Sequence, residues 1–173
     1  MRAPKLLLCA LAACTTLSGC GLHPLYGGGV NGPVQSTLAA VEVGPIEGQA
    51  GWLVSHALRD RLSTGQSATP RYRLDVKLDD HIAGLGVRRD DSVARERRTL
   101  RARFQLVDLS NGAVVLDATA GSDAGIDVVG SEYATIAAER TALERLTDIV
   151  ADQIVARVAR FAQNPPASAA PAQ

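Results

Sequence analysis

The amino-acid sequence predicts an α+β domain, a two-layer sandwich of element order β-α-β-β-β-α, with two helices on one face of a four-stranded, mainly antiparallel sheet. Three observations predict it. Two long segments alternate apolar and charged residues as strands do, two others carry apolar stripes at helical spacing, and an Asn-Gly pair marks a tight turn. Because every strand has one apolar face and each helix one apolar stripe, two layers bury them all.

The first two elements are a short strand and a short helix. Residues 37–43 (TLAAVEV) are rich in β-branched and apolar side chains, which favours a strand. In residues 50–63 the apolar residues recur every four positions, which indicates an amphipathic helix. Its stripe consists of Val54, Leu58 and Leu62.

Two long strands are expected next, as a hairpin. Residues 71–82 and 92–109 alternate apolar and charged side chains, so each strand has one face for the core and one for solvent. Residues 84–91 (GLGVRRDD) form the tip between them. The core-facing residues of the second strand are Leu100, Ala102, Phe104 and Leu106.

The last two elements are a third long strand and a long helix. Asn111-Gly112 is a strong turn signal, and residues 113–122 follow it as a strand. Residues 131–161 carry apolar side chains at intervals of three or four, which predicts a helix long enough to cross a whole sheet. The stripe consists of Leu143, Leu146, Val150, Ile154, Val158 and Phe161.

The N-terminus has the layout of a secretory signal. Arg2 and Lys5 precede an apolar run at 6–13, which is too short to span a bilayer as a mature helix. The run leads to LSGC, which resembles a bacterial lipobox. We therefore expect residues 1–19 to be removed and the Cys20 thiol to carry a lipid; the alternative is an ordinary signal in which that cysteine is incidental.

The rest of the chain divides into three parts. Residues 20–36, rich in Gly and Pro, are expected to be a lipidated flexible tether, and residues 37–163 a single α+β domain. Residues 164–173 (NPPASAAPAQ) are expected to be a disordered tail. Cys9 and Cys14 leave with the signal, so the mature chain has no free thiol for a disulfide, a metal site or nucleophilic catalysis.

The charge balance and the aromatic content of the chain exclude some classes of function. The full chain has 18 basic and 18 acidic side chains, and loss of the signal with its two cations leaves 16 against 18, a net charge of −2. Only 3% of residues are aromatic. Neither a bulk polyanion binder nor a base-stacking surface fits these numbers, so we expect no nucleic-acid partner.

Enzyme signatures are absent from the sequence. The three histidines, His23, His56 and His81, form no nucleophile–base pattern, and there is no HExxH, GxSxG or P-loop motif. In the Asp79-Asp80-His81 run, neighbouring side chains of a strand point to opposite faces, which is unsuitable for a metal. We expect no catalytic residue, metal or cofactor.

The arginines are the residues best suited to binding a ligand. Seven arginines fall in residues 88–103 against three acids, so this window carries a charge of +4. Planar guanidinium groups recognise phosphate or carboxylate in bidentate fashion. The candidate binding residues are Arg88 and Arg89 at the tip and Arg95, Arg97, Arg101 and Arg103 on one outward stripe.

The stripe has an alternative explanation as an ordinary solvated sheet face. A hairpin register that places Asp75 opposite Arg103, and Asp79 opposite Thr99, would neutralise part of it across the strands. Charges at a tip also protect sheet edges from aggregation. From the residues alone, both explanations remain open.

Four short motifs follow one another along the chain: CGLHPLYG at 20–27, YRLDV at 72–76, the turn at 108–112, and SEYA at 131–134. In this order they resemble the lipopolysaccharide-assembly lipoprotein family LptE in its alphaproteobacterial form. Leu22 stands where that group has an aromatic residue.

The resemblance implies a non-enzymatic lipoprotein of the outer membrane, anchored by its lipid and facing the periplasm and a barrel lumen. Its implied partners are an LptD-type β-barrel and lipopolysaccharide, which the family binds through basic residues near a hairpin. Arg88 and Arg89 best match that location. An auxiliary lipoprotein of an ABC-type lipid transporter is the alternative function.

The lipobox makes a direct prediction. Replacing Cys20 by Ser removes the thiol that would carry the lipid, so metabolic labelling of the protein with a radioactive fatty acid should be lost. Cys14→Ser, within the expected signal, is the matched control and should keep its label. Continued labelling of Cys20→Ser would refute the anchor.

Overall fold

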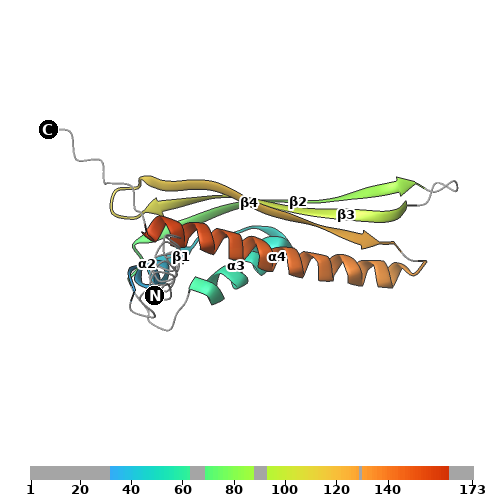
Figure 1. The fold of residues 1–173 in the computed structure, drawn as a ribbon, viewed down its shortest axis with the longest axis horizontal. Helices are drawn as coiled ribbons and strands as arrows, with labels where there is room; N and C mark the ends of the chain where they lie inside the picture. The colour runs from blue at the N-terminus through green and yellow to red at the C-terminus, as the bar shows by residue number, and fades with distance from the viewer. Residues whose placement is uncertain (1–31, 63–68, 88–92, 129, 164–173) are drawn as a thin grey trace, which may run out of the picture.

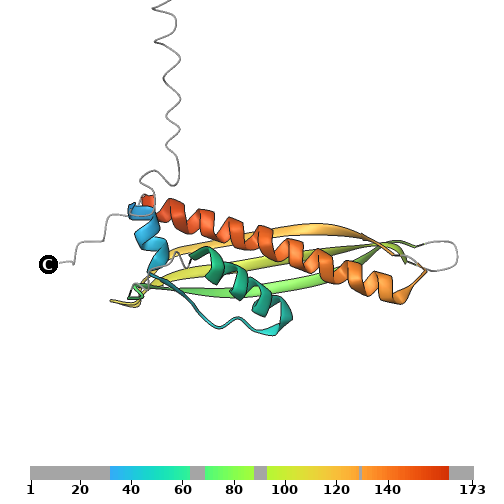
Figure 2. The same ribbon diagram turned by 90° about the horizontal axis from the view of Figure 1, so that it is seen from below.

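The computed structural model describes residues 32–62, 69–87, 93–128 and 130–163. A four-stranded sheet forms one layer, and the helices form a second layer on one of its faces (Figure 1; Figure 2). The elements are α2 (Pro33–Ala39), β1 (Val41–Val43), α3 (Gly48–Leu62), β2 (Tyr72–Val87), β3 (Val93–Asp108), β4 (Val114–Asp127) and α4 (Glu132–Gln163). The predicted α+β class is confirmed, and so is the predicted order β-α-β-β-β-α from β1 onward.

The sheet has the strand order β1-β2-β3-β4 and is mixed. β1 pairs with β2 in parallel, with Val43 opposite Leu74, while the other two pairings are antiparallel. The predicted turn joins β3 to β4: Gly112 has a φ of 72°, which favours glycine, and the Asn111 side chain accepts a hydrogen bond of 2.9 Å from the amide of Ala113. This tight turn makes β3 and β4 neighbours.

Helix α4 holds the two layers together. It has 32 residues, so it is about 48 Å long and runs under β3 and β4 (Figure 2). Its stripe is buried against the inward side chains of the sheet, of which Phe104 is the largest, and against α3. Near its C-terminal end, the rings of Phe161 and Tyr72 meet edge to face with centroids 5.9 Å apart. The predicted stripe residues Leu143, Leu146, Val150, Ile154 and Val158 are all buried.

The expected first strand is partly wrong. Residues 33–39 form helix α2, and only Val41–Val43 are a strand. Proline is favourable in the first turn of a helix, and Val34 and Leu38, four residues apart, are both buried beside α4. Burial of this pair outweighs the strand preference of the sequence, and it brings 33–36, placed in the tether from sequence, into the folded part.

The long hairpin extends further than predicted. β2 continues to Val87 and β3 begins at Val93, so residues 84–87, expected in the tip, belong to a strand. The pairing continues beyond Ala83, with Glu96 and Arg95 of β3 opposite Gly84 and Leu85. β4 likewise ends at 127 rather than 122.

Candidate functional site: the charged face of the sheet

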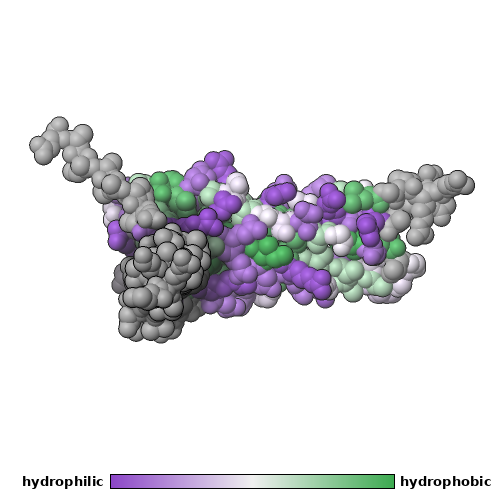
Figure 3. Space-filling model, in the orientation of Figure 1, coloured by the Kyte–Doolittle hydropathy of each residue, from purple (hydrophilic) through white to green (hydrophobic). Residues whose placement is uncertain are grey.

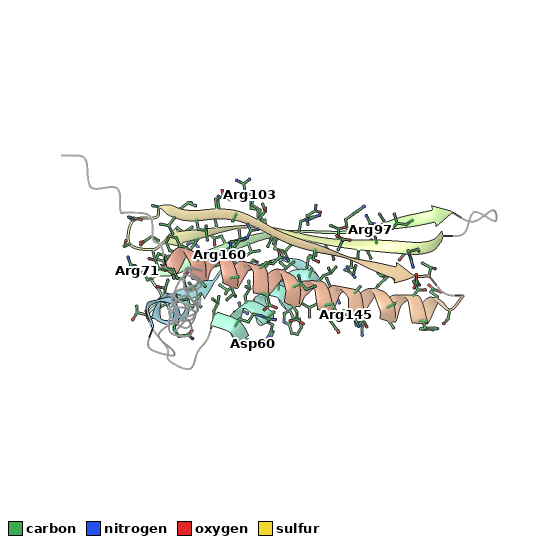
Figure 4. All side chains as sticks on the ribbon, viewed as in Figure 1. Asp60, Arg71, Arg97, Arg103, Arg145 and Arg160 are labelled. Carbon is green, nitrogen blue, oxygen red and sulfur yellow. The ribbon has the colours of Figure 1, made fainter. Side chains whose placement is uncertain are left out.

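The odd-numbered residues of the long strands project from the side of the sheet that the helices do not cover. Arg95, Arg97, Arg101 and Arg103 are all exposed there, as the alternation predicted. Figure 4 shows Arg103 projecting away from the helices, whereas Asp60 and Arg145 belong to the helix layer. Hydrophilic groups project from the same sheet side in Figure 3. The predicted stripe is therefore present as a surface, which we call the outer face.

Three of the four stripe arginines pair with aspartates of β4. Nε of Arg95 lies 2.9 Å from Oδ1 of Asp127, and Nη2 of Arg103 lies 3.0 Å from Oδ2 of Asp117. Arg97 and Asp123 approach to 3.8 Å. These side chains are 38–75% exposed, and ion pairs of that kind contribute about 0–1 kcal/mol each. The pairs neutralise the outer face more than they stabilise the fold.

The hairpin register considered under the solvated-face alternative differs from the observed register by two residues. Asp75 stands opposite Gln105 and Asp79 opposite Arg101, instead of Arg103 and Thr99. Asp75 pairs along its own strand with Arg73, at 2.9 Å. A shift of two leaves every side chain on its face, so the predicted outer face survives although the partners change.

Arg101 differs from the other stripe arginines. On β4 it stands opposite Gly121, and in the described part of the chain no carboxylate lies within 4.0 Å of its guanidinium. Lys77 on β2 is likewise without an acid partner there. Both line a hollow of about 600 Å³ on the outer face. Asp79 stands opposite Arg101 on β2, so among the described residues the middle of this face is the part with the fewest close ion pairs and not a part without acids.

Arg98 and Glu96 belong to the arginine-rich window but lie on the helix side of the sheet, as their even positions require. Arg98 donates to Asp80 (Nε to Oδ1, 2.8 Å) and to the backbone oxygen of Glu139 on α4 (3.0 Å). It ties the first half of α4 to the hairpin. Glu96 Oε2 is buried without a hydrogen-bond partner among the residues of the described ranges.

Several sequence predictions lie outside the described residues: the signal at 1–19, the tail at 164–173, the tip arginines Arg88 and Arg89, the lipid-bearing Cys20, and His23. The other two histidines are described. The ring of His56 packs edge-on against Trp52 at 4.9 Å, and His81 is exposed on the outer face. Neither lies in a cluster of metal-ligating side chains within the described ranges.

No described helix is both long enough and apolar enough to cross a membrane.

Comparison with known proteins gives one family and several similar structures. The model of the LptE family, described as lipopolysaccharide-assembly, matches residues 38–158. A candidate lipoprotein from Caulobacter crescentus CB15 is similar in structure at 24% identity, with a TM-score of 0.63, over 77% of this chain and 99% of that one. A comparison with curated protein sequences found no match.

Two further lipoprotein structures share the fold. A minor lipoprotein from Acinetobacter baumannii has 14% identity and a TM-score of 0.56, over 70% of this chain and 92% of that one. Lipoprotein B from Nitrosomonas europaea has 16% identity and a TM-score of 0.55, over 73% and 89%. At these identities the likeness concerns the fold alone.

The ion pairs of the outer face make a testable prediction. The Arg103 guanidinium, and after it the Gln105 amide, donate to Asp117 and hold the pKa of that carboxyl below its usual value of about 3.9. Because the folded pKa is the lower one, the pair's contribution to stability is present above about pH 4 and is lost as the pH falls through the folded pKa.

Carboxyl ¹³C NMR titration should therefore place the Asp117 midpoint below about 3.9, and Arg103→Gln should move it upward. Arg61→Gln is the matched control, since Arg61 bonds instead to Asp148 and Asp152 on α4. An Asp117 midpoint that does not respond to Arg103→Gln would contradict the pairing.

Proposed function

The chain belongs to the lipopolysaccharide-assembly family LptE, and on that premise we propose that it is an outer-membrane lipoprotein that partners a β-barrel translocon and binds lipopolysaccharide. The observation that carries the proposal is the extent of the family match. Residues 38–158 run from the end of α2 into the last turns of α4, and so include the whole sheet and the helix that packs on it. In this role the protein assembles and positions other molecules and performs no catalysis.

The outer face supports a polar protein partner. A barrel interior is lined by polar side chains, so a surface that enters it must keep its charges hydrated or paired. On the outer face, the arginines at both ends of the stripe have aspartate partners. Such a face meets a polar wall without burying unpaired charge.

The arginines named from the sequence remain the proposed contacts for lipopolysaccharide. The ion pairs of the outer face change which of them we consider first. Arg95, Arg97 and Arg103 would have to exchange an aspartate for the lipid's phosphate. Arg101 has no acid within 4.0 Å in the described part of the chain, although Asp79 stands opposite it on β2. Arg88 and Arg89 are proposed from the family resemblance. We therefore place the tip pair and Arg101 ahead of the other three.

Co-purification tests the partnership. An affinity-tagged full-length chain, extracted from membranes in mild detergent, should recover a large β-barrel protein of the LptD type, identified by mass spectrometry. The matched control is the tagged Cys20→Ser chain, which should recover less barrel because it loses its anchor. Recovery of a permease or a periplasmic substrate-binding subunit instead would favour the ABC-transporter alternative and overturn the proposal.

The tip arginines are tested by charge reversal. Arg88→Glu with Arg89→Glu should weaken lipopolysaccharide binding by the purified protein about tenfold or more, because two charge-assisted contacts are replaced by repulsion. Arg140→Glu with Arg145→Glu is the matched control, since both side chains are exposed on α4 and the change in net charge is the same. Equal binding by the two double variants, with unchanged circular dichroism, would remove the tip from the proposal.

A further inference from the structure

The hollow of about 600 Å³ lies in the middle of the outer face, between the ion pairs near its ends. It crosses β2, β3 and β4 at Leu78, Ala102 and Ala120, which stand opposite one another and whose side chains belong to the core side of the sheet. Its volume is in the range of small-molecule pockets, about 300–1,000 Å³. The charged residues that line it are Lys77, Asp79, Arg101, Arg103 and Arg157, a net charge of +3.

The cations of the hollow are crowded and mostly unpaired. Lys77 stands directly opposite Arg103 in the β2–β3 pairing, and like charges in that position destabilise a sheet. Arg103 is relieved by Asp117, but no acid of the described ranges lies within 4.0 Å of Lys77, Arg101 or Arg157. An anion bound in the hollow would remove this repulsion.

Gly121 gives Arg101 its position. A Cβ added to Gly121 would lie 2.6 Å from Cδ of Arg101 and 3.0 Å from its Nη1. The arginine side chain therefore lies across the backbone of β4, in space that any other residue at 121 would occupy. Glycine within a strand weakens it and commonly marks such a close approach.

Helix α4 packs on the other face of the sheet, and two of its side chains reach the hollow at the edge of β4. Gln153 reaches the edge of β4, where its Oε1 accepts from the Gly121 amide (3.0 Å) and its Nε2 donates to the Gly121 oxygen (3.3 Å). Arg157 is four residues further on and therefore on the same side of the helix. Gln153 thus fixes the edge of β4, and Arg157 adds a cation beside it.

We propose that this hollow is a binding site for a phosphate monoester. Arg101 binds the phosphate through its guanidinium, with Lys77 and Arg157 as further donors from β2 and α4. Cations from three elements suit a group with three peripheral oxygens better than a carboxylate, which has two. The volume leaves room for the sugar, glycerol or other group to which the phosphate is esterified.

The site goes beyond the proposed contacts for lipopolysaccharide, because it depends on Lys77, Arg157 and Gly121, which the arginine hypothesis did not include. Arg101 belongs both to this site and to the proposed contacts for lipopolysaccharide. To that extent the site deepens the proposed function and rests on it. Phosphate binding is measured on the purified chain and barrel partnership by co-purification, so either can fail while the other stands.

Two soluble probes distinguish the source of the phosphate. Glucose 1-phosphate carries the monoester on a sugar, and dihexanoyl phosphatidic acid, kept below its micelle concentration, carries it on a lipid. Added to the ¹⁵N-labelled full chain in non-ionic detergent, a bound probe should shift the amide resonances of Gly121 and Thr119. Binding of both supports recognition of the phosphate itself, and binding of one alone supports the site and assigns its source.

Variants tie the binding to the hollow. Arg101→Gln should weaken it about tenfold or more, and Asp79→Asn should tighten it several-fold, because the single acid of the lining is removed. Gly121→Ala keeps every charge but displaces the Arg101 side chain, so it should also weaken binding. Arg95→Gln is the matched control, a loss of one cation from the outer face outside the hollow, and should have little effect.

The outcomes that overturn the proposal are equally definite. Failure of both probes to shift Gly121 and Thr119 would show that the hollow does not bind a monoester. Equal weakening by Arg95→Gln and Arg101→Gln would show a diffuse attraction to the whole face instead of a site. Retention of full affinity by Gly121→Ala, with an unchanged spectrum elsewhere, would contradict the position given to Arg101.

Discussion

The structure depends on the contact between the apolar stripe of α4 and the inward face of the sheet. Phe104, Leu106 and Leu100 of β3 are fully buried there, against side chains such as Val150 and Ile154 of the helix. Each fully buried side chain of this size contributes about 1.5–3 kcal/mol. Successive side chains of a β-strand point to opposite faces of the sheet. Because the even-numbered side chains are buried in this contact, the odd-numbered ones must lie on the other face.

The outer face therefore consists of the odd-numbered residues of the long strands. Strand β3 has arginine at four of its eight odd positions and cannot turn these side chains inward, so their repulsion has to be relieved within the face. β4 does this with aspartates at 117, 123 and 127. The series is interrupted by Thr119 and Gly121, and the hollow lies at that interruption. Among the described residues of the outer face, the cations without a close acid partner are thus gathered at the hollow.

The spacing of apolar residues was sufficient to predict the two layers of the fold. It was insufficient to predict which residues stand opposite one another on neighbouring strands. The stripe of α4 and the outward side of Arg95 to Arg103 follow from local spacing alone. The register of the hairpin does not, since a shift of two residues conserves both faces, and the choice is made by the length of the hairpin and by contacts with β4. Helix α2 was missed for a related reason: burial of Val34 and Leu38 is a tertiary effect that no local pattern contains.

The proposed phosphate site and the predicted tip lie at different places along the molecule. The sixteen residues of β2 span about 53 Å, and α2, where the described chain begins, lies at the end opposite to Val87 (Figure 1). Leu78, which marks the row of the hollow, is the seventh residue of that strand, so about 30 Å separate the hollow from the strand's far end. Exposed charges so far apart are several screening lengths from one another at physiological salt. Charges at the hollow and at the Val87 end of β2 are therefore electrostatically independent, and a ligand that reached from one to the other would have to be long enough to follow the outer face.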